Sequence, residues 1–170
     1  MRPPSTIRRL ALAGLAAALI AAPAATAGTP TPPTGVREQI ADPVFLLSLP
    51  ADGGAWTLWS GTLDGDVWWM LSSPRARKIA GAGCPRKPPA LTVCFHGEVA
   101  PGRTVVVGRV KPRAATVTAV DQAGRKLRLA RRGGAYLAVA RGRPKTVTVV
   151  ARDRSGDVVA RRFFDYRRRP

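Results

Sequence analysis

The chain has no asparagine, a single histidine and only two cysteines. Without Asn there is no N-glycosylation sequon. Because one His, His96, and no paired-Cys motif supply too few ligands, a zinc site is not expected. The sequence also lacks a Gly-x-Ser-x-Gly elbow, a phosphate loop and a dinucleotide fingerprint. We therefore predict no metal, no cofactor and no catalytic residues.

A hydrolytic enzyme that uses His96 remains the alternative. Glu98, two residues further on, could share a strand face with His96 and orient its ring. The His-Gly-Glu string is superficially similar to the zinc deaminase signature, but the required Pro-Cys-x-x-Cys is missing. Asp64 and Asp66 flank Gly65, and a turn explains them better than a carboxylate pair.

The first 27 residues have the three parts of a secretory signal. Arg2, Arg8 and Arg9 precede an apolar run, residues 10–22, that is too short to span a bilayer. The small residues at 25–27 form a cleavage site, so we predict cleavage after Ala27 and a secreted or envelope-associated protein. The adjacent arginines leave twin-arginine export open beside the general route. No long apolar segment follows, so we expect no transmembrane segment after cleavage.

Composition divides the rest of the chain into four parts. Residues 28–41 are rich in Pro and Thr, which is typical of a linker. Residues 42–100 form a neutral, Trp-rich β region, residues 101–166 a basic sandwich-like region, and residues 167–170 a basic tail. The length after cleavage suits one ordinary domain or two very small ones, and we expect a monomer.

Asp64-Gly65 between two apolar runs predicts a two-residue β-hairpin in the first part. Pairing Leu63 with Asp66 places two of the four Trp side chains on each face. Burial of both pairs between other elements is one interpretation. The sharper alternative is an exposed aromatic platform of Trp59 and Trp68 that binds carbohydrate.

Cys84 and Cys94 are the two cysteines of a chain with an export signal. In that setting an even number of cysteines indicates a disulfide, and one pair allows a single connectivity. We therefore predict a disulfide that closes the loop between them and contributes about 2 to 3 kcal/mol by the chain-entropy argument.

Short β-branched runs alternate with Gly-bearing turns from Thr104 to Phe164, which predicts antiparallel strands. Two turns are alike, residues 121–125 and 153–157, each with Gly where a three-residue hairpin loop needs a left-handed residue. The expected register of the first hairpin places Ala119 opposite Leu127 and Val117 opposite Leu129. In the second, Val147 would lie opposite Phe163. One face would then be apolar and the other mostly polar or basic.

The positive charge is concentrated in the second half of the chain. Residues 28–100 carry six basic and six acidic side chains, whereas residues 101–170 carry nineteen basic and four acidic ones, for a net charge of +15. Such a field attracts polyanions. The alternative is that an arginine-rich composition merely solvates the outer face.

The partner that we expect is an anionic polymer or a membrane surface, bound without catalysis. Sequence-specific nucleic-acid recognition is not expected, because the tail offers Tyr166 alone as a stacking side chain. The residues predicted to bind polyanions are Lys126, Arg128, Arg131, Arg132, Arg141, Arg143, Lys145, Arg162, Arg167, Arg168 and Arg169.

Several of these segments resemble a loose group of small secreted actinobacterial proteins of unknown function. The resemblance is carried by the Trp-rich hairpin (56–73), the Cys pair, the strand 105–110 and the closing hairpin 151–159. The last part is similar to immunoglobulin-like or fibronectin-like β-modules. The resemblance implies an all-β fold, an antiparallel β-sandwich, and brings no catalytic residues.

Overall fold

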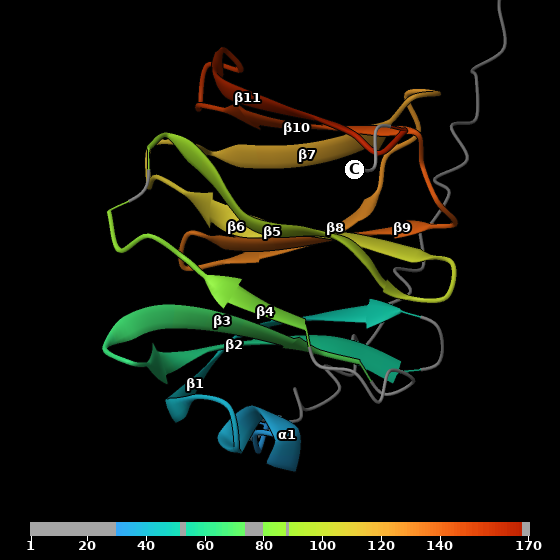
Figure 1. The fold of residues 1–170 in the computed structure, drawn as a ribbon. Coiled ribbons are helices and arrows are strands. Elements are labelled where there is room, and N and C mark those ends of the chain that lie inside the picture. Colours follow the sequence, from blue (N-terminus) through green and yellow to red (C-terminus); the bar gives the residue numbers. More distant parts are fainter. Residues whose placement is uncertain (1–29, 52–53, 74–79, 88, 168–170) are drawn as a thin grey trace, which may run out of the picture.

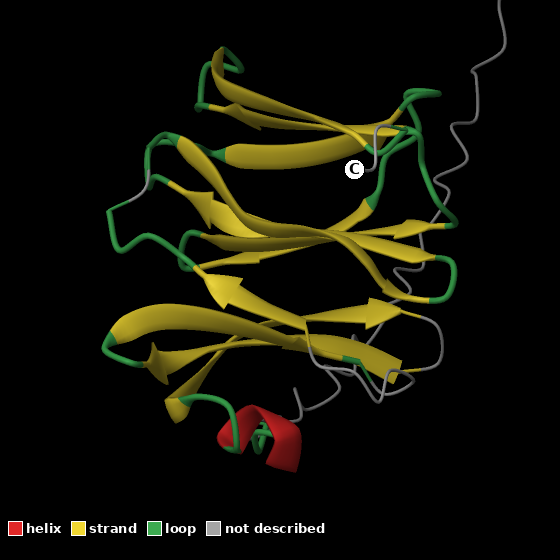
Figure 2. Ribbon diagram, viewed as in Figure 1, coloured by secondary structure: helices red, strands yellow, loops and turns green. Residues whose placement is uncertain are grey.

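The computed structural model describes residues 30–51, 54–73, 80–87 and 89–167. These residues form three stacked antiparallel sheets with one short helix beneath the first sheet (Figures 1 and 2). The predicted signal peptide, the start of the predicted linker and most of the basic tail lie outside the described residues. The all-β prediction is confirmed.

The first sheet has the order β1-β2-β3-β4. It follows the helix α1 in the chain. These elements are α1 (Thr34–Arg37), β1 (Ala41–Ala51), β2 (Gly54–Leu63), β3 (Asp66–Ser72) and β4 (Ala80–Gly83).

The other two sheets have the orders β5-β6-β9-β8 and β11-β10-β7. Their strands are β5 (Leu91–Ala100), β6 (Arg103–Val110), β7 (Thr116–Asp121), β8 (Arg128–Arg132), β9 (Ala135–Arg141), β10 (Thr146–Arg152) and β11 (Val158–Asp165). With these strands lettered A to G in chain order, the sheets read ABED and GFC, which is the arrangement of an immunoglobulin-type sandwich. The sandwich begins at Leu91 rather than at residue 101, because β5 is its first strand.

The middle sheet is covered on both faces. One face packs on the first sheet through a core that includes Leu58, Val107 and Leu137. The other face packs on the third sheet through Val106 and Val149, among others. Strands buried on both sides can be apolar at consecutive positions, which explains why β6 and β9 read as continuous rather than alternating hydrophobic runs.

The Trp hairpin has the predicted register. Leu63 pairs with Asp66, and Asp64 and Gly65 both have positive φ, 53° and 82°, as a type I′ turn requires. Trp56 and Trp69 face the middle sheet. Trp59 faces the opposite way.

The predicted linker contains a structural element that covers the second Trp pair. In α1 and the turn after it, Val36 and Ile40 are buried against Trp59 and Met70. Trp59 is only 1% exposed, and its indole N–H donates to Thr57 Oγ1 at 3.1 Å. The exposed platform of Trp59 and Trp68 is therefore wrong for Trp59, which is buried, and Trp68 is partly buried.

The first Gly hairpin of the sandwich forms only in part. Its turn is as predicted, since the amide of Leu127 donates to the carbonyl of Ala119 at 2.8 Å. Beyond that point β8 leaves β7 and pairs with β9 in the middle sheet, so Leu129 lies opposite Ala138 rather than Val117. Leu127 and Leu129 nevertheless pack into the core between the sheets.

A β-bulge changes the register of the second hairpin. Arg152 pairs with Val158 but Ala151 pairs with Ala160, so one residue of β11 has no partner. As a result Val147 lies opposite Phe164, not Phe163. Phe163 turns outward and is 60% exposed.

The predicted disulfide joins Cys84, just after β4, to Cys94 in β5, with a Cα–Cα distance of 4.9 Å. It therefore links the first sheet to the sandwich. None of the described helices has the length and apolar character needed to cross a membrane.

Candidate anion-binding groove

Four chain reversals meet at one end of the sandwich. They are the disulfide-closed loop and the β6–β7, β8–β9 and β10–β11 connections, on the left of Figure 1. Loops at an end of an immunoglobulin-type sandwich extend beyond the packed sheets and are free to carry binding residues. The side chain of Arg86 ties the disulfide loop to the neighbouring β2–β3 turn by donating to Gly65 O at 3.0 Å.

A groove of about 1080 Å³ lies between three of these segments. We call it the basic groove. Five of its lining residues are basic, and no carboxylate lines it among the residues that the structure describes. The lining residues are Lys87, Arg109, Val110, Lys111, Pro112, Arg131, Arg132, Gly133 and Gly134.

Strand register places two of the arginines side by side. Arg109 of β6 and Arg132 of β8 both pair with Ala135 of β9, so the three side chains share the face toward the first sheet. The guanidinium of Arg109 lies 5.8 Å from the ring centroid of Trp69, and that of Arg132 lies 5.7 Å from the ring centroid of Phe45. Cation–π contacts of this kind hold both arginines at the edge of the first sheet.

Arg131 points to the other side of β8. Its Nη1 and Nη2 donate to the carbonyls of Ala115 and Ala114 at 2.8 and 2.6 Å. Arg131 and Pro112 also line a second hollow of about 780 Å³, which adds Arg113 and Arg154 and one carboxylate, Asp153. The basic surface thus continues from the groove across the β6–β7 connection to the β10–β11 turn.

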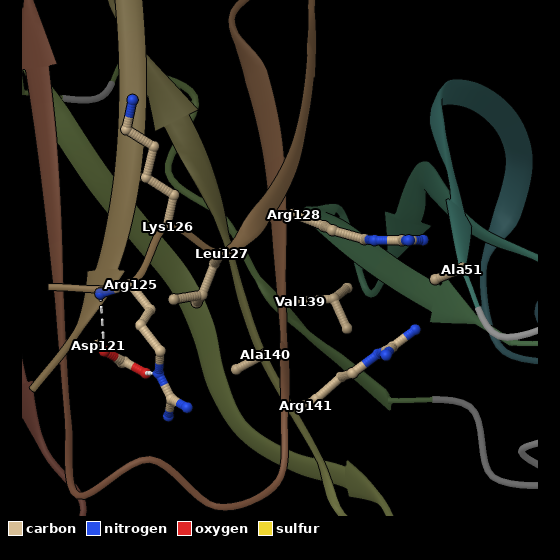
Figure 3. Close-up of a pocket in the computed structure, with 9 residues that line it drawn as sticks. All are labelled: Ala51, Asp121, Arg125, Lys126, Leu127, Arg128, Val139, Ala140 and Arg141. Atoms are coloured by element: carbon tan, nitrogen blue, oxygen red, sulfur yellow. Dashed lines mark hydrogen bonds and ion pairs between the residues drawn. The ribbon is translucent and has the colours of Figure 1, made fainter. Parts of the chain in front are cut away.

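The opposite end of the sandwich is also basic, and three of its arginines form ion pairs. Arg125 pairs with Asp121, Arg143 with Glu98 and Arg167 with Asp165, at 2.7, 2.7 and 2.8 Å. A smaller hollow of about 330 Å³ lies there. Figure 3 shows Arg128 and Arg141 extending side by side toward Ala51 while Lys126 points away from them.

The predicted polyanion residues are therefore dispersed rather than gathered in one patch. Arg131 and Arg132 line the basic groove, Lys126, Arg128 and Arg141 line the hollow at the opposite end, and Arg143, Lys145 and Arg167 line another beside Tyr166. Arg162 is exposed on β11, facing the middle sheet, opposite Val149. Arg168 and Arg169 lie outside the described residues.

The sequence pattern did not predict a binding role for three of the groove residues, Lys87, Arg109 and Lys111. Lys87 follows β4, whereas Arg109 lies in β6 and Lys111 directly after it. Nothing local indicates that these two segments lie at the same end of the sandwich. The available signal was the immunoglobulin-like strand order, because alternate connections of an antiparallel sandwich share one end.

His96 lies on β5 with its ring near two aromatic side chains. Ring centroids of His96 and Phe164 are 4.4 Å apart, and those of His96 and Tyr166 are 5.4 Å apart. Partial burial lowers the pKa of His96 below its ordinary value. Burial raises the pKa of Tyr166 to about 12.

The expected orienting carboxylate, Glu98, is engaged elsewhere. Its Oε1 accepts from the amide of Gly102 at 3.0 Å, and its Oε2 pairs with Arg143 Nε. Within the described part of the chain, no group of three or more His, Cys, Asp or Glu side chains could hold a metal ion.

Comparison with known proteins identifies no relative: no family model, no curated protein and no solved structure matches the chain. Its function is therefore inferred from the geometry of its own residues.

Proposed function

We propose that the protein is exported and binds anionic polymers outside the cell, without catalysis, through the basic groove. The observation that carries this proposal is that five basic residues line one groove whose described lining includes no carboxylate. Converging like charges repel one another, and a polyanion that enters the groove relieves that repulsion.

The position of the groove supports the proposal. It is formed by end loops, which can contact a long polymer without disturbing the buried sheets. Three ion pairs at the other end neutralise part of the charge there, whereas no carboxylate lines the groove among the described residues.

Removing cations from the groove should weaken binding more than removing the same charge elsewhere. We expect the triple variant Lys87→Ala, Lys111→Ala, Arg132→Ala to bind linear polyphosphate and polyglutamate roughly a hundredfold more weakly, at about 1 kcal/mol for each cation removed. The slope of log affinity against log salt should fall by about one for each anionic group of the polymer that is no longer neutralised. Fluorescence titration with labelled polymer at several salt concentrations measures both quantities.

The matched control removes the same net charge from other exposed positions, as Lys126→Ala, Lys145→Ala, Arg161→Ala. We expect this control to show only the small effect of a weaker overall field. Equally weakened binding in the two triple variants would mean that net charge alone governs binding, and the proposed groove would be wrong.

Substituting the only histidine separates binding from hydrolysis. His96 lies outside the basic groove, so His96→Ala should leave polymer affinity unchanged within twofold. A polymer-degrading activity that His96→Ala abolishes, followed as the release of short products, would contradict the non-catalytic proposal.

A further inference from the structure

We infer that the basic groove is a preorganised site for phosphate groups, in which Arg109, Arg131 and Arg132 grip the phosphates and Lys87 and Lys111 add charge. This inference rests on the proposed function and names its ligand class. The ligand would be a polymer that carries successive phosphates.

Arg109 is fixed before any ligand arrives. Its Nη1 donates to the carbonyls of Pro85 and Arg86, both at 3.1 Å, while its guanidinium lies over Trp69. These bonds occupy Nη1 only, so the N–H groups of Nε and Nη2 remain for a ligand in the described structure. A side chain that is already ordered loses less conformational entropy on binding.

Arg131 and Arg132 are fixed by different contacts. Arg131 is held by the carbonyls of Ala114 and Ala115, and Arg132 by the ring of Phe45. Ring stacking uses the face of the guanidinium and leaves its N–H edge for hydrogen bonds. The groove is thus lined by three arginines that other residues hold in position and by two lysines.

The arrangement suits a chain of phosphates. A guanidinium donates two parallel hydrogen bonds to a phosphate, and a lysine acts only as a point charge. Arg109 and Arg132 start two strands apart, which is about 10 Å between Cα atoms. Long side chains at that spacing can reach neighbouring phosphates of one chain, and each phosphate of the chain supplies at least one negative charge to the five cations.

Charge-conserving substitutions test this inference, with inorganic tripolyphosphate and citrate as probes. We expect the wild-type protein to bind tripolyphosphate at least tenfold more tightly than citrate in isothermal titration calorimetry at fixed pH and salt. The double variant Arg109→Lys, Arg131→Lys keeps the charge but loses two guanidinium groups that can each donate two parallel hydrogen bonds. Its affinity for tripolyphosphate should fall by about tenfold or more while the salt slope stays the same.

Two further variants distinguish a loss of binding from a folding defect. Arg132→Lys removes a guanidinium that no hydrogen bond within the described part of the chain ties to the backbone. It should weaken tripolyphosphate binding while the circular-dichroism spectrum and melting temperature stay at wild-type values. Arg128→Lys, at the opposite end, should leave the affinity unchanged.

The outcomes separate the two proposals. If the lysine variants bind tripolyphosphate as tightly as the wild type, or if citrate binds equally well, the phosphate inference is overturned while a groove for polyanions in general stands. If the triple alanine variant of the groove also keeps full affinity for the polymers, the proposed function falls as well.

Discussion

Gly108 lies in the middle of β6, where the ring of Tyr136 crosses the strand. The hydroxyl of Tyr136 donates to the carbonyl of Thr92 on β5 at 3.1 Å, and the side chain is fully buried. A Cβ at Gly108 would lie 2.6 Å from that hydroxyl oxygen and would also collide with the carbonyl of Thr92. This residue is therefore glycine because a ring occupies the space of its side chain.

We expect Gly108→Ala to lower the free energy of unfolding by about 1 to 3 kcal/mol, the usual cost of overpacking. Gly83→Ala is the matched control, since Gly83 also lies in a strand and a Cβ there meets nothing within 4 Å. Urea denaturation measures both variants. Equal unfolding free energies in the two variants would show that the ring of Tyr136 does not need the space that a Cβ at Gly108 would occupy.

Asp153 gives the β10–β11 turn a defined pH dependence. Its Oδ1 accepts from the hydroxyl and amide of Ser155 and from the amide of Asp157. The hydrogen bond from the Ser155 side chain, partly opposed by desolvation and aided by backbone amides, lowers the pKa of Asp153 below its ordinary value of 3.8. A depressed carboxyl pKa stabilises the fold above the unfolded-state pKa and loses that contribution as pH falls through the folded one.

Stability should therefore decline below about pH 4, in part through this turn. An Asp153→Asn variant, which cannot ionise, should show a smaller loss between pH 5 and pH 3 than the wild type. Urea denaturation across that interval gives the comparison. An identical decline in both proteins would show that Asp153 does not contribute to the loss of stability at low pH.

At the scale of elements, sequence pattern predicted the strands well and their partners less well. Alternation and turn residues depend on neighbours in the chain, which is why the Trp hairpin and the turns at 121–125 and 153–157 were predicted correctly. The departure of β8 to the middle sheet and the bulge in β11 follow from packing against distant strands. The pattern of neighbouring residues in the sequence does not indicate such packing.

The disulfide-closed loop connects stability with binding. It supplies the two carbonyls, of Pro85 and Arg86, that hold Arg109 in the basic groove. We expect the double variant Cys84→Ser, Cys94→Ser to lose about 2 to 3 kcal/mol of unfolding free energy. It should also bind tripolyphosphate several-fold more weakly while still folded, because the carbonyls are no longer held in place.

Urea denaturation and calorimetry on the same samples separate the two effects. A folded, reduced-stability variant with wild-type affinity would show that the loop does not position Arg109.

At the scale of the whole molecule, the arginines have two uses. Along β8, the edge strand of the middle sheet, Arg128 donates to Pro50 O, Arg131 to the β6–β7 connection, and Arg132 stacks on Phe45. These interactions tie the three layers together, and charge on an edge strand also discourages pairing with another chain. Part of the arginine content is thus structural.

The candidate site could be predicted in its charge but not in its shape. Composition identified the basic half of the chain, which includes Arg131 and Arg132. The groove itself depends on which connections share an end of the sandwich, and this brings Lys87 and Lys111 beside them. Only the three-dimensional strand order contains that information.

Amide hydrogen exchange, with and without linear polyphosphate, tests the central claim most directly. If the groove end binds the polymer, exchange should slow in residues 85–87, 109–113 and 131–134, and remain unchanged in residues 121–128 and 141–145. Slowing at the second set, or equal slowing over the whole surface, would contradict the groove as the binding site.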